Sequence, residues 1–67
     1  MRDWLINIRK SKKLSQEKLA DDINISREYI SMLESGDRNP SVSVAKLIGE
    51  SLDFDWQKFF DIDVTNR

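Results

Sequence analysis

The side chains that could carry covalent chemistry in this sequence are few and scattered. The chain has no cysteine and no histidine, which excludes thiolate nucleophiles, disulfides, zinc fingers and histidine-based proton transfer. The remaining acid–base candidates are carboxylates, namely Asp21 with Asp22 and Asp61 with Asp63. In a chain this rich in charge, a solvated surface explains them better than a catalytic site does. We therefore predict that the protein is not an enzyme and that it carries no metal and no cofactor.

Basic side chains that could bind phosphate gather near the amino end. They are Arg9, Lys10, Lys12 and Lys13. The run follows Trp4, Leu5 and Ile8, which share a helical face, so the cations would stand at a helix carboxyl end, where the dipole favours positive charge. The run can be a solvated, dipole-matched helix end, or it can contact phosphate. The two roles are compatible.

The balance of charge argues mildly against nucleic acid as a partner. The net charge is -1, whereas a DNA-binding domain usually carries a basic excess. The distribution softens this objection, because residues 1–38 carry eight basic and seven acidic groups and residues 39–67 carry three and five. With few surplus cations there is little counterion release, so specific contacts or dimerisation would have to supply more of any DNA affinity.

Residues 16–35 have the apolar spacing of two short helices joined by a tight turn. Leu19 and Ile23 are one helical turn apart, and so, nearly, are Ile30 and Leu33, which places each pair on one helical face. Two inward faces are thus specified. We expect the two helices to pack against each other and against the rest of the core.

The junction between these helices needs one small residue and one flexible residue. Ala20 stands where the helices would cross, and only a small side chain lets two backbones approach closely. Asn24 stands at the turn, and asparagine tolerates the left-handed conformation better than most residues other than glycine. The pattern predicts a helix-turn-helix, whose second helix lies in the DNA major groove. A plain helical hairpin is the alternative, because it would share part of this residue pattern.

Capping signals predict where the helices begin and end. Ser15, Ser26 and Asp55 each follow an apolar residue that can pack against the next turn, which is the arrangement of a cap with a hydrophobic staple. Ser41 is a further cap, for a fourth helix. Gly36 suits the left-handed exit from the third helix.

These signals predict an all-α fold, a compact domain of five helices over residues 1–67 with the helix-turn-helix at about residues 16–35. The helices are expected at about 3–12, 16–23, 27–34, 42–52 and 56–60. Apolar and polar residues alternate over residues 60–64, so the tail, residues 61–67, could form a short strand or fray. No apolar run approaches the roughly 18 to 20 residues of a membrane span, and the amino end lacks a signal-peptide core. We expect a soluble, cytoplasmic protein.

The whole pattern resembles the Cro and lambda-repressor type of helix-turn-helix regulator, the XRE family. The residues that carry the resemblance are Arg9, Leu14, Ser15, Gln16, Leu19, Ala20, Ser26, Arg27, Ile30, Glu34, Gly36, Asn39, Pro40 and Ser41. The resemblance implies a five-helix, lambda-repressor-like domain, usually dimeric, that binds a double-stranded DNA operator with two related half-sites. Such proteins repress or activate nearby genes in bacteria or their phages. A membrane, a metal or a small-molecule effector is not expected as a partner.

The resemblance also assigns roles to individual residues. The expected base readers are Arg27, Glu28 and Met32. The residues expected to contact phosphate or to position the domain are Gln16, Ser26, Tyr29, Ser31, Ser35, Arg38, Asn39 and Ser41. Arginine can pair bidentately with guanine, glutamate can accept from a cytosine amine, and methionine can pack on a thymine methyl. The alternatives are a neutral first-turn residue for Gln16 and simple turn and cap chemistry for the loop.

Two positions depart from the family pattern, and one pair of charges follows it. Asn24 replaces the usual turn glycine, which is sterically acceptable. Met32 stands where a polar or basic reader is common, which weakens the expected base readout. By the resemblance, Arg9 and Glu34 form a partly buried ion pair that ties the first helix to the end of the third; the alternative is two independent surface charges.

We expect a symmetric homodimer formed by the carboxyl-terminal part of the chain. The interface candidates are Leu52, Phe54, Trp56, Phe60, Ile62 and Val64, because one small domain cannot easily bury them all. Alternatively, Trp56 and Phe59 close the core of the monomer. The acidic net charge and aromatic end also leave open a different function, in which the same fold binds a protein, as an antitoxin-like or anti-repressor partner.

Overall fold

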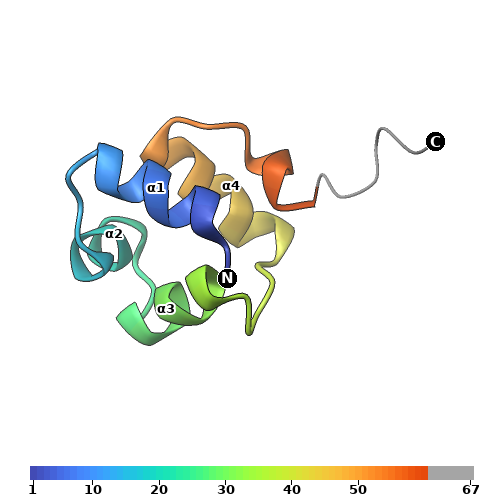
Figure 1. The fold of residues 1–67 in the computed structure, drawn as a ribbon, viewed down its shortest axis with the longest axis horizontal. Helices are drawn as coiled ribbons and strands as arrows, with labels where there is room; N and C mark the ends of the chain where they lie inside the picture. Colours follow the sequence, from blue (N-terminus) through green and yellow to red (C-terminus); the bar gives the residue numbers. More distant parts are fainter. Residues whose placement is uncertain (61–67) are drawn as a thin grey trace.

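The computed structural model describes residues 1–60, which form four α-helices and one 3-10 helix around a single core (Figure 1). The elements are α1 (Asp3–Ser11), α2 (Gln16–Ile23), α3 (Arg27–Ser35), α4 (Val42–Leu52) and the 3-10 helix η1 (Trp56–Phe60). Helix α3 packs against α1 and α2, while α4 packs against α2 and η1. The all-α architecture thus holds in every described part of the chain.

The prediction of five α-helices is wrong in its last element. Residues 56–60 form a 3-10 helix, entered through a turn in which the Lys58 amide donates to the Asp55 carbonyl at 3.0 Å. The Asp55 side chain holds the same turn by accepting from the Gln57 amide at 3.0 Å. Segments this short often keep the tighter i→i+3 bonding, because they cannot repay an α-helical nucleus. The proposed strand falls within residues 61–67, outside the described residues, and residues 1–60 contain no strand.

Three serine side chains begin three of the helices, which confirms the predicted caps. Each serine Oγ accepts a hydrogen bond from the backbone amide three residues later, which satisfies one of the free amides of the first turn. The pairs are Ser15 with Lys18 at 3.0 Å, Ser26 with Tyr29 at 3.1 Å, and Ser41 with Val44 at 3.2 Å.

Left-handed residues end three of the helices. Asn24 (φ 61°) ends α2 and Gly36 (φ 92°) ends α3, as their residue types predicted. Asp53 (φ 61°) ends α4 in the same way, and Lys13 (φ 60°) turns the chain between α1 and α2. Residue type alone did not predict these last two, because lysine rarely adopts this conformation and aspartate adopts it at only a minority of positions.

The core combines aliphatic side chains from all four α-helices with one aromatic residue from η1. Its buried apolar members are Leu5, Leu19, Ala20, Ile30, Leu33, Ala45, Ile48, Leu52 and Phe59. Gly49 is also buried, and a Cβ placed on it would lie 2.8 Å from the Phe54 carbonyl oxygen. The absence of a side chain at Gly49 therefore lets the turn before η1 lie directly on α4.

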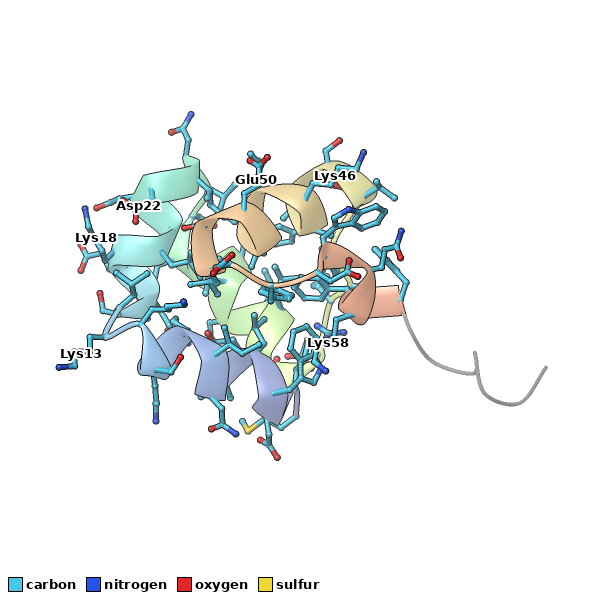
Figure 2. The ribbon with its side chains drawn as sticks, turned by 90° about the horizontal axis from the view of Figure 1, so that it is seen from above. Lys13, Lys18, Asp22, Lys46, Glu50 and Lys58 are labelled. Atoms are coloured by element: carbon cyan, nitrogen blue, oxygen red, sulfur yellow. The ribbon has the colours of Figure 1, made fainter. Side chains whose placement is uncertain are left out.

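An aromatic cluster joins η1 to the amino-terminal helix. The Trp4 ring meets the Phe54 and Phe59 rings edge-on, with centroids 5.3 and 5.0 Å apart, a favourable geometry. Lys58, labelled in Figure 2, covers the Trp4 ring with its ammonium 5.3 Å from the centroid. Within residues 1–60, no helix is long and apolar enough to cross a membrane.

Candidate nucleic-acid interface

Helices α2 and α3 form the unit on which the candidate interface lies. The two helices pack against each other, and Figure 1 shows α2 at the left of the molecule and α3 at the bottom. The turn between them is fixed by the left-handed Asn24 and by a hydrogen bond of 3.0 Å from the Ile25 amide to the Ala20 carbonyl. Ala20 itself is only 2% exposed. Because the inner face of α3 is held in the core by Ile30 and Leu33, its outer face has one fixed direction.

The outer face of α3 carries most of the predicted base readers. Arg27, Glu28 and Ser31 are exposed, and their spacing places them on one side of the helix. Tyr29 and Met32 are half-buried and pack partly onto the domain. The face therefore presents one cation, one carboxylate and one hydroxyl to the solvent. These groups can form hydrogen bonds with base edges in a major groove.

Gln16, at the first position of α2, lies beside the first residue of α3. Its Oε1 accepts a hydrogen bond of 3.4 Å from Arg27 Nη1. Its Nε2 donates to Glu34 Oε1 at 2.9 Å. The side chain is therefore oriented by α3 at both ends, with one amide hydrogen left to donate. This hydrogen could reach a phosphate.

A buried ion pair lies beneath this amide. Arg9 Nε is 2.6 Å and Arg9 Nη2 is 3.3 Å from the carboxylate of Glu34, and Arg9 Nη1 donates to the Leu14 carbonyl at 2.7 Å. Arg9 is 8% exposed and Glu34 is 3% exposed. Together with Gln16, these side chains form one network that joins α1, α2 and α3.

The end of α3 and the loop after it hold three more of the predicted contacts, Ser35, Arg38 and Asn39. Arg38 and Asn39 are exposed, and the Arg38 amide donates to the Met32 carbonyl at 3.3 Å. Ser35 is used inside the turn, where its hydroxyl donates to the Met32 carbonyl at 3.1 Å and accepts from the Asp37 amide at 3.2 Å. Its hydrogen is thus engaged within the protein.

Two predicted phosphate contacts are serine caps whose hydroxyl hydrogens are not used by the cap. The oxygens of Ser26 and Ser41 accept backbone amides, and a serine hydroxyl can still donate while it accepts. Both residues are exposed. Each could therefore donate to a phosphate without giving up its cap.

One residue of this region was missed by the sequence reasoning. Arg2 is half-buried, its guanidinium donates to the carbonyls of Leu33 and Arg38, and it also donates to Asn39 Oδ1 at 2.7 Å. Its backbone amide donates to the Glu34 carbonyl at 2.7 Å. Nothing in the sequence marks a single arginine before the first helix as different from other surface cations.

The candidates for a dimer interface are spread over very different environments. Leu52 is 0% exposed and belongs to the core, so it is not available to a partner. Phe54 and Trp56 are half-buried, and Phe60 is 41% exposed. The other two candidates, Ile62 and Val64, lie outside the described residues.

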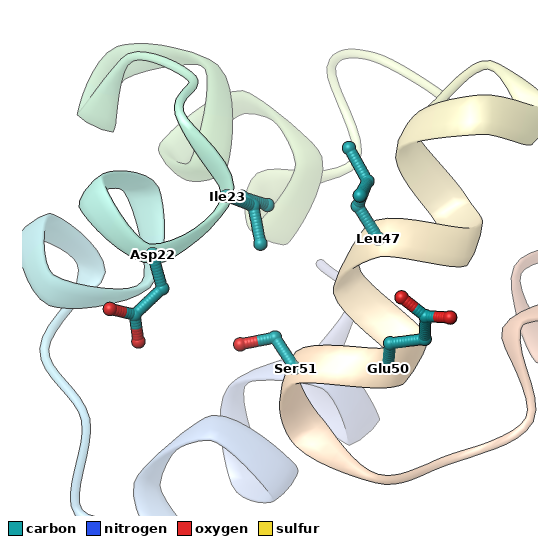
Figure 3. A pocket seen from close by; sticks show the side chains of 5 residues that line it. All are labelled: Asp22, Ile23, Leu47, Glu50 and Ser51. Carbon is teal, nitrogen blue, oxygen red and sulfur yellow. The ribbon is translucent and has the colours of Figure 1, made fainter.

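An open pocket between α2 and α4 lies apart from the groups described above (Figure 3). It is lined by Asp22, Ile23, Leu47, Glu50 and Ser51. The two carboxylates would repel phosphate, so the pocket does not suit nucleic acid. Among the described residues, no group of three or more acidic side chains is placed to hold a metal ion.

Comparison with known proteins agrees with this geometry. Residues 5–59 match a family model described as helix-turn-helix. The chain is also 50% identical over 67 residues to the uncharacterized HTH-type transcriptional regulator YqaF of Bacillus subtilis, an alignment that covers 100% of this chain and 87% of that protein. The resemblance inferred from the sequence is therefore confirmed, and the chain belongs to the XRE-type helix-turn-helix family of DNA-binding transcriptional regulators.

Proposed function

We propose that the protein is a sequence-specific regulator that binds an inverted-repeat operator in double-stranded DNA as a symmetric homodimer. The observation that carries the proposal is the exposed polar face of α3, held in one direction by the buried network beneath it. A recognition surface must be rigid to select one sequence, since its donors and acceptors have to meet those of the bases. Regulation, by repression or activation, would follow from where the operator lies relative to a promoter in the cytoplasm of a prokaryotic cell.

Base readout in this proposal rests on the first turn of α3. Arg27 would donate two hydrogen bonds to a guanine, and Glu28 would accept from a cytosine amine. Met32, which is half-buried, would add only an apolar contact with a thymine methyl. So few side chains can distinguish only a few base pairs. A second copy that reads a second half-site would therefore supply much of the specificity.

Phosphate contacts would fix the domain on the duplex on both sides of α3. Gln16 would donate from the start of α2, and Arg38 and Asn39 would donate from the loop after α3. Hydroxyl donors would come from Ser26, Ser31 and Ser41, and Tyr29 would add a phenol at the edge of the face. Such contacts set the register of the protein and carry little information on sequence.

The dimer we propose uses the aromatic end of the chain. Phe60 exposes an apolar ring, and Trp56 lies beside it with the ring centroids 6.2 Å apart. For both copies to bind one operator, a two-fold axis near these rings must set the two α3 helices in successive major grooves. Leu52 is omitted from this interface because the core buries it.

A gel-shift assay on the DNA upstream of the protein's own gene, over a series of salt concentrations, tests the proposal. We expect a complex at low salt whose affinity falls steeply as salt rises, because bound phosphates release counterions. A scrambled duplex of equal length is the control. Absence of any complex with DNA, together with salt-insensitive binding to another protein, would contradict the proposal and favour a protein-interaction module.

A further inference from the structure

Arg2 connects three segments that are distant in the sequence. Its backbone amide bonds to the Glu34 carbonyl, its guanidinium bonds to the loop at Arg38 and Asn39, and the guanidinium carbon lies 5.4 Å from the centroid of the Phe59 ring. In Figure 1 the amino terminus lies beside the carboxyl end of α3. Arg2 lies outside the helix-turn-helix, yet it binds the loop that follows α3.

At the end of α3, Arg2 satisfies carbonyl groups that a helix cannot satisfy by itself. The last four carbonyls of an α-helix lack intrahelical partners, and Arg2 supplies donors to those of Leu33 and Glu34. Its positive charge also stands at the negative end of the helix dipole. These contacts fix Arg2 at the end of α3, next to the loop that follows this helix.

In the loop, the chemistry of arginine determines how the Asn39 amide is turned. A guanidinium has donors and no acceptor, so the Asn39 atom that lies 2.7 Å from Arg2 Nη2 must be the oxygen. The amide nitrogen of Asn39 then occupies the other branch of an exposed side chain. A phosphate oxygen accepts only, and this nitrogen is the group that can donate to it.

The loop backbone is held on both sides of this amide. The Arg38 amide donates to the Met32 carbonyl at 3.3 Å, and the Arg38 carbonyl accepts from Arg2 Nη1 at 3.2 Å. Pro40, directly after Asn39, is buried. Asn39 therefore projects from a backbone with little freedom, and the orientation of its side chain depends on Arg2.

We propose that Arg2 is a positioning residue for DNA binding, which turns the Asn39 amide so that its nitrogen donates to a backbone phosphate. The inference rests on the proposed function, because it needs a duplex beside the loop. The planar fork of arginine reaches Asn39 and Arg38 at the same time, whereas a lysine ammonium on its flexible stem does not reproduce the fork. Charge at this position is therefore insufficient, and the fork geometry is required.

A double-mutant cycle on the full chain tests this assignment. The probe is a duplex that the wild-type protein has selected from a random DNA pool, and the variants are Arg2→Lys, Asn39→Ala and the double variant. We expect Arg2→Lys to weaken binding on the order of tenfold, the range of one hydrogen bond to a charged group. In the Asn39→Ala background the same change should weaken binding less than about twofold, because the two residues act as one unit.

A second readout reports on the amide itself. In the free protein, the NMR signals of the Asn39 side-chain amide should shift in Arg2→Lys while most backbone signals stay in place. Asn39→Asp keeps an acceptor for Arg2 and so preserves the contact. It should nevertheless bind the duplex more weakly than Asn39→Ala, because the carboxylate repels phosphate.

Each contrary result overturns the assignment in a recognisable way. Wild-type affinity in Arg2→Lys would mean that charge alone suffices, and equal losses in both backgrounds would mean a purely structural role. If Arg2→Lys does not fold, Asn39→Asp decides alone, and binding equal to wild type would refute a phosphate beside Asn39. Failure of the wild-type chain to bind any duplex would contradict the proposed function itself. This outcome is separate from the others, because they all require a complex between the wild-type chain and DNA.

Discussion

Arg9 and Glu34, which are 25 residues apart in the sequence, meet in a buried ion pair with Nε and Oε2 2.6 Å apart. The pair joins α1 to the last turn of α3, and Gln16 extends it to α2 at 2.9 Å. Among the described residues, every buried side-chain nitrogen or oxygen atom has a hydrogen-bond partner. A charge cluster of this kind fixes the angles between three helices only while all its members are present.

Removal of Glu34 should therefore destabilise the protein strongly. Glu34→Ala leaves the Arg9 guanidinium buried without its counterion, a change that typically costs about 3 to 5 kcal/mol. The control is Asp22→Ala, which breaks the exposed pair between Lys18 and Asp22 (3.2 Å) and should cost less than about 1 kcal/mol. Urea unfolding measures both. A loss below about 1 kcal/mol for Glu34→Ala would contradict the structural role assigned to the pair.

A methyl group at Gly49 should destabilise α4 even though it raises helix propensity. In an open helical position, glycine to alanine gains about 1 kcal/mol. Here the added Cβ would lie 2.8 Å from the Phe54 carbonyl oxygen and 3.0 Å from Trp56 Cβ, and overpacking of this kind costs about 1 to 3 kcal/mol. Ser43→Ala, at an exposed position of the same helix, is the control and should be neutral or slightly stabilising. A Gly49→Ala variant more stable than wild type in urea would refute this packing.

Dimerisation should depend on the exposed ring at the end of η1. We expect sedimentation equilibrium at micromolar concentration to give twice the 7.9 kDa of one chain. Phe60→Asp should shift this mass toward the monomer, because a buried unpaired carboxylate opposes association. The control is Leu47→Asp, since Leu47 is 42% exposed, close to the 41% of Phe60, but lines the pocket between α2 and α4. A clean wild-type monomer that also binds DNA as a monomer would rule out the dimer.

Sequence reasoning succeeded where the determining contact is local. The cap at Ser15 and the left-handed turn at Asn24 depend on residues within one helical turn, so residue type alone predicts them. The bond between Arg2 and Asn39 spans 37 residues and depends on the packing of α1 against α3. Residues 56–60 carried a helical pattern, but periodicity does not distinguish a short α-helix from a 3-10 helix. Leu52 is an apolar residue at a helix end, and this type and position do not show whether a residue packs in the core or at a dimer interface.

The two residues at the start of α2 and α3 should affect DNA binding differently. Arg27→Ala should cost about 1 to 3 kcal/mol and relax the preference at one guanine-containing position. Gln16→Ala should weaken binding to all sequences alike, because a phosphate contact carries no base information. Both variants are compared across single-base operator variants at fixed salt, under conditions in which circular dichroism shows both folded. A uniform loss for Arg27→Ala together with a changed preference for Gln16→Ala would place α3 in a different orientation.

Selection of bound duplexes from a random DNA pool by the wild-type chain tests whether this protein binds DNA sequence-specifically as a dimer. If the outer face of α3 reads bases and two copies bind together, the selected pool will contain an imperfect inverted repeat. The centres of its half-sites will lie about 10 to 10.5 base pairs apart, one helical turn of DNA. A pool that stays random through successive rounds at low salt would contradict sequence-specific binding by this face.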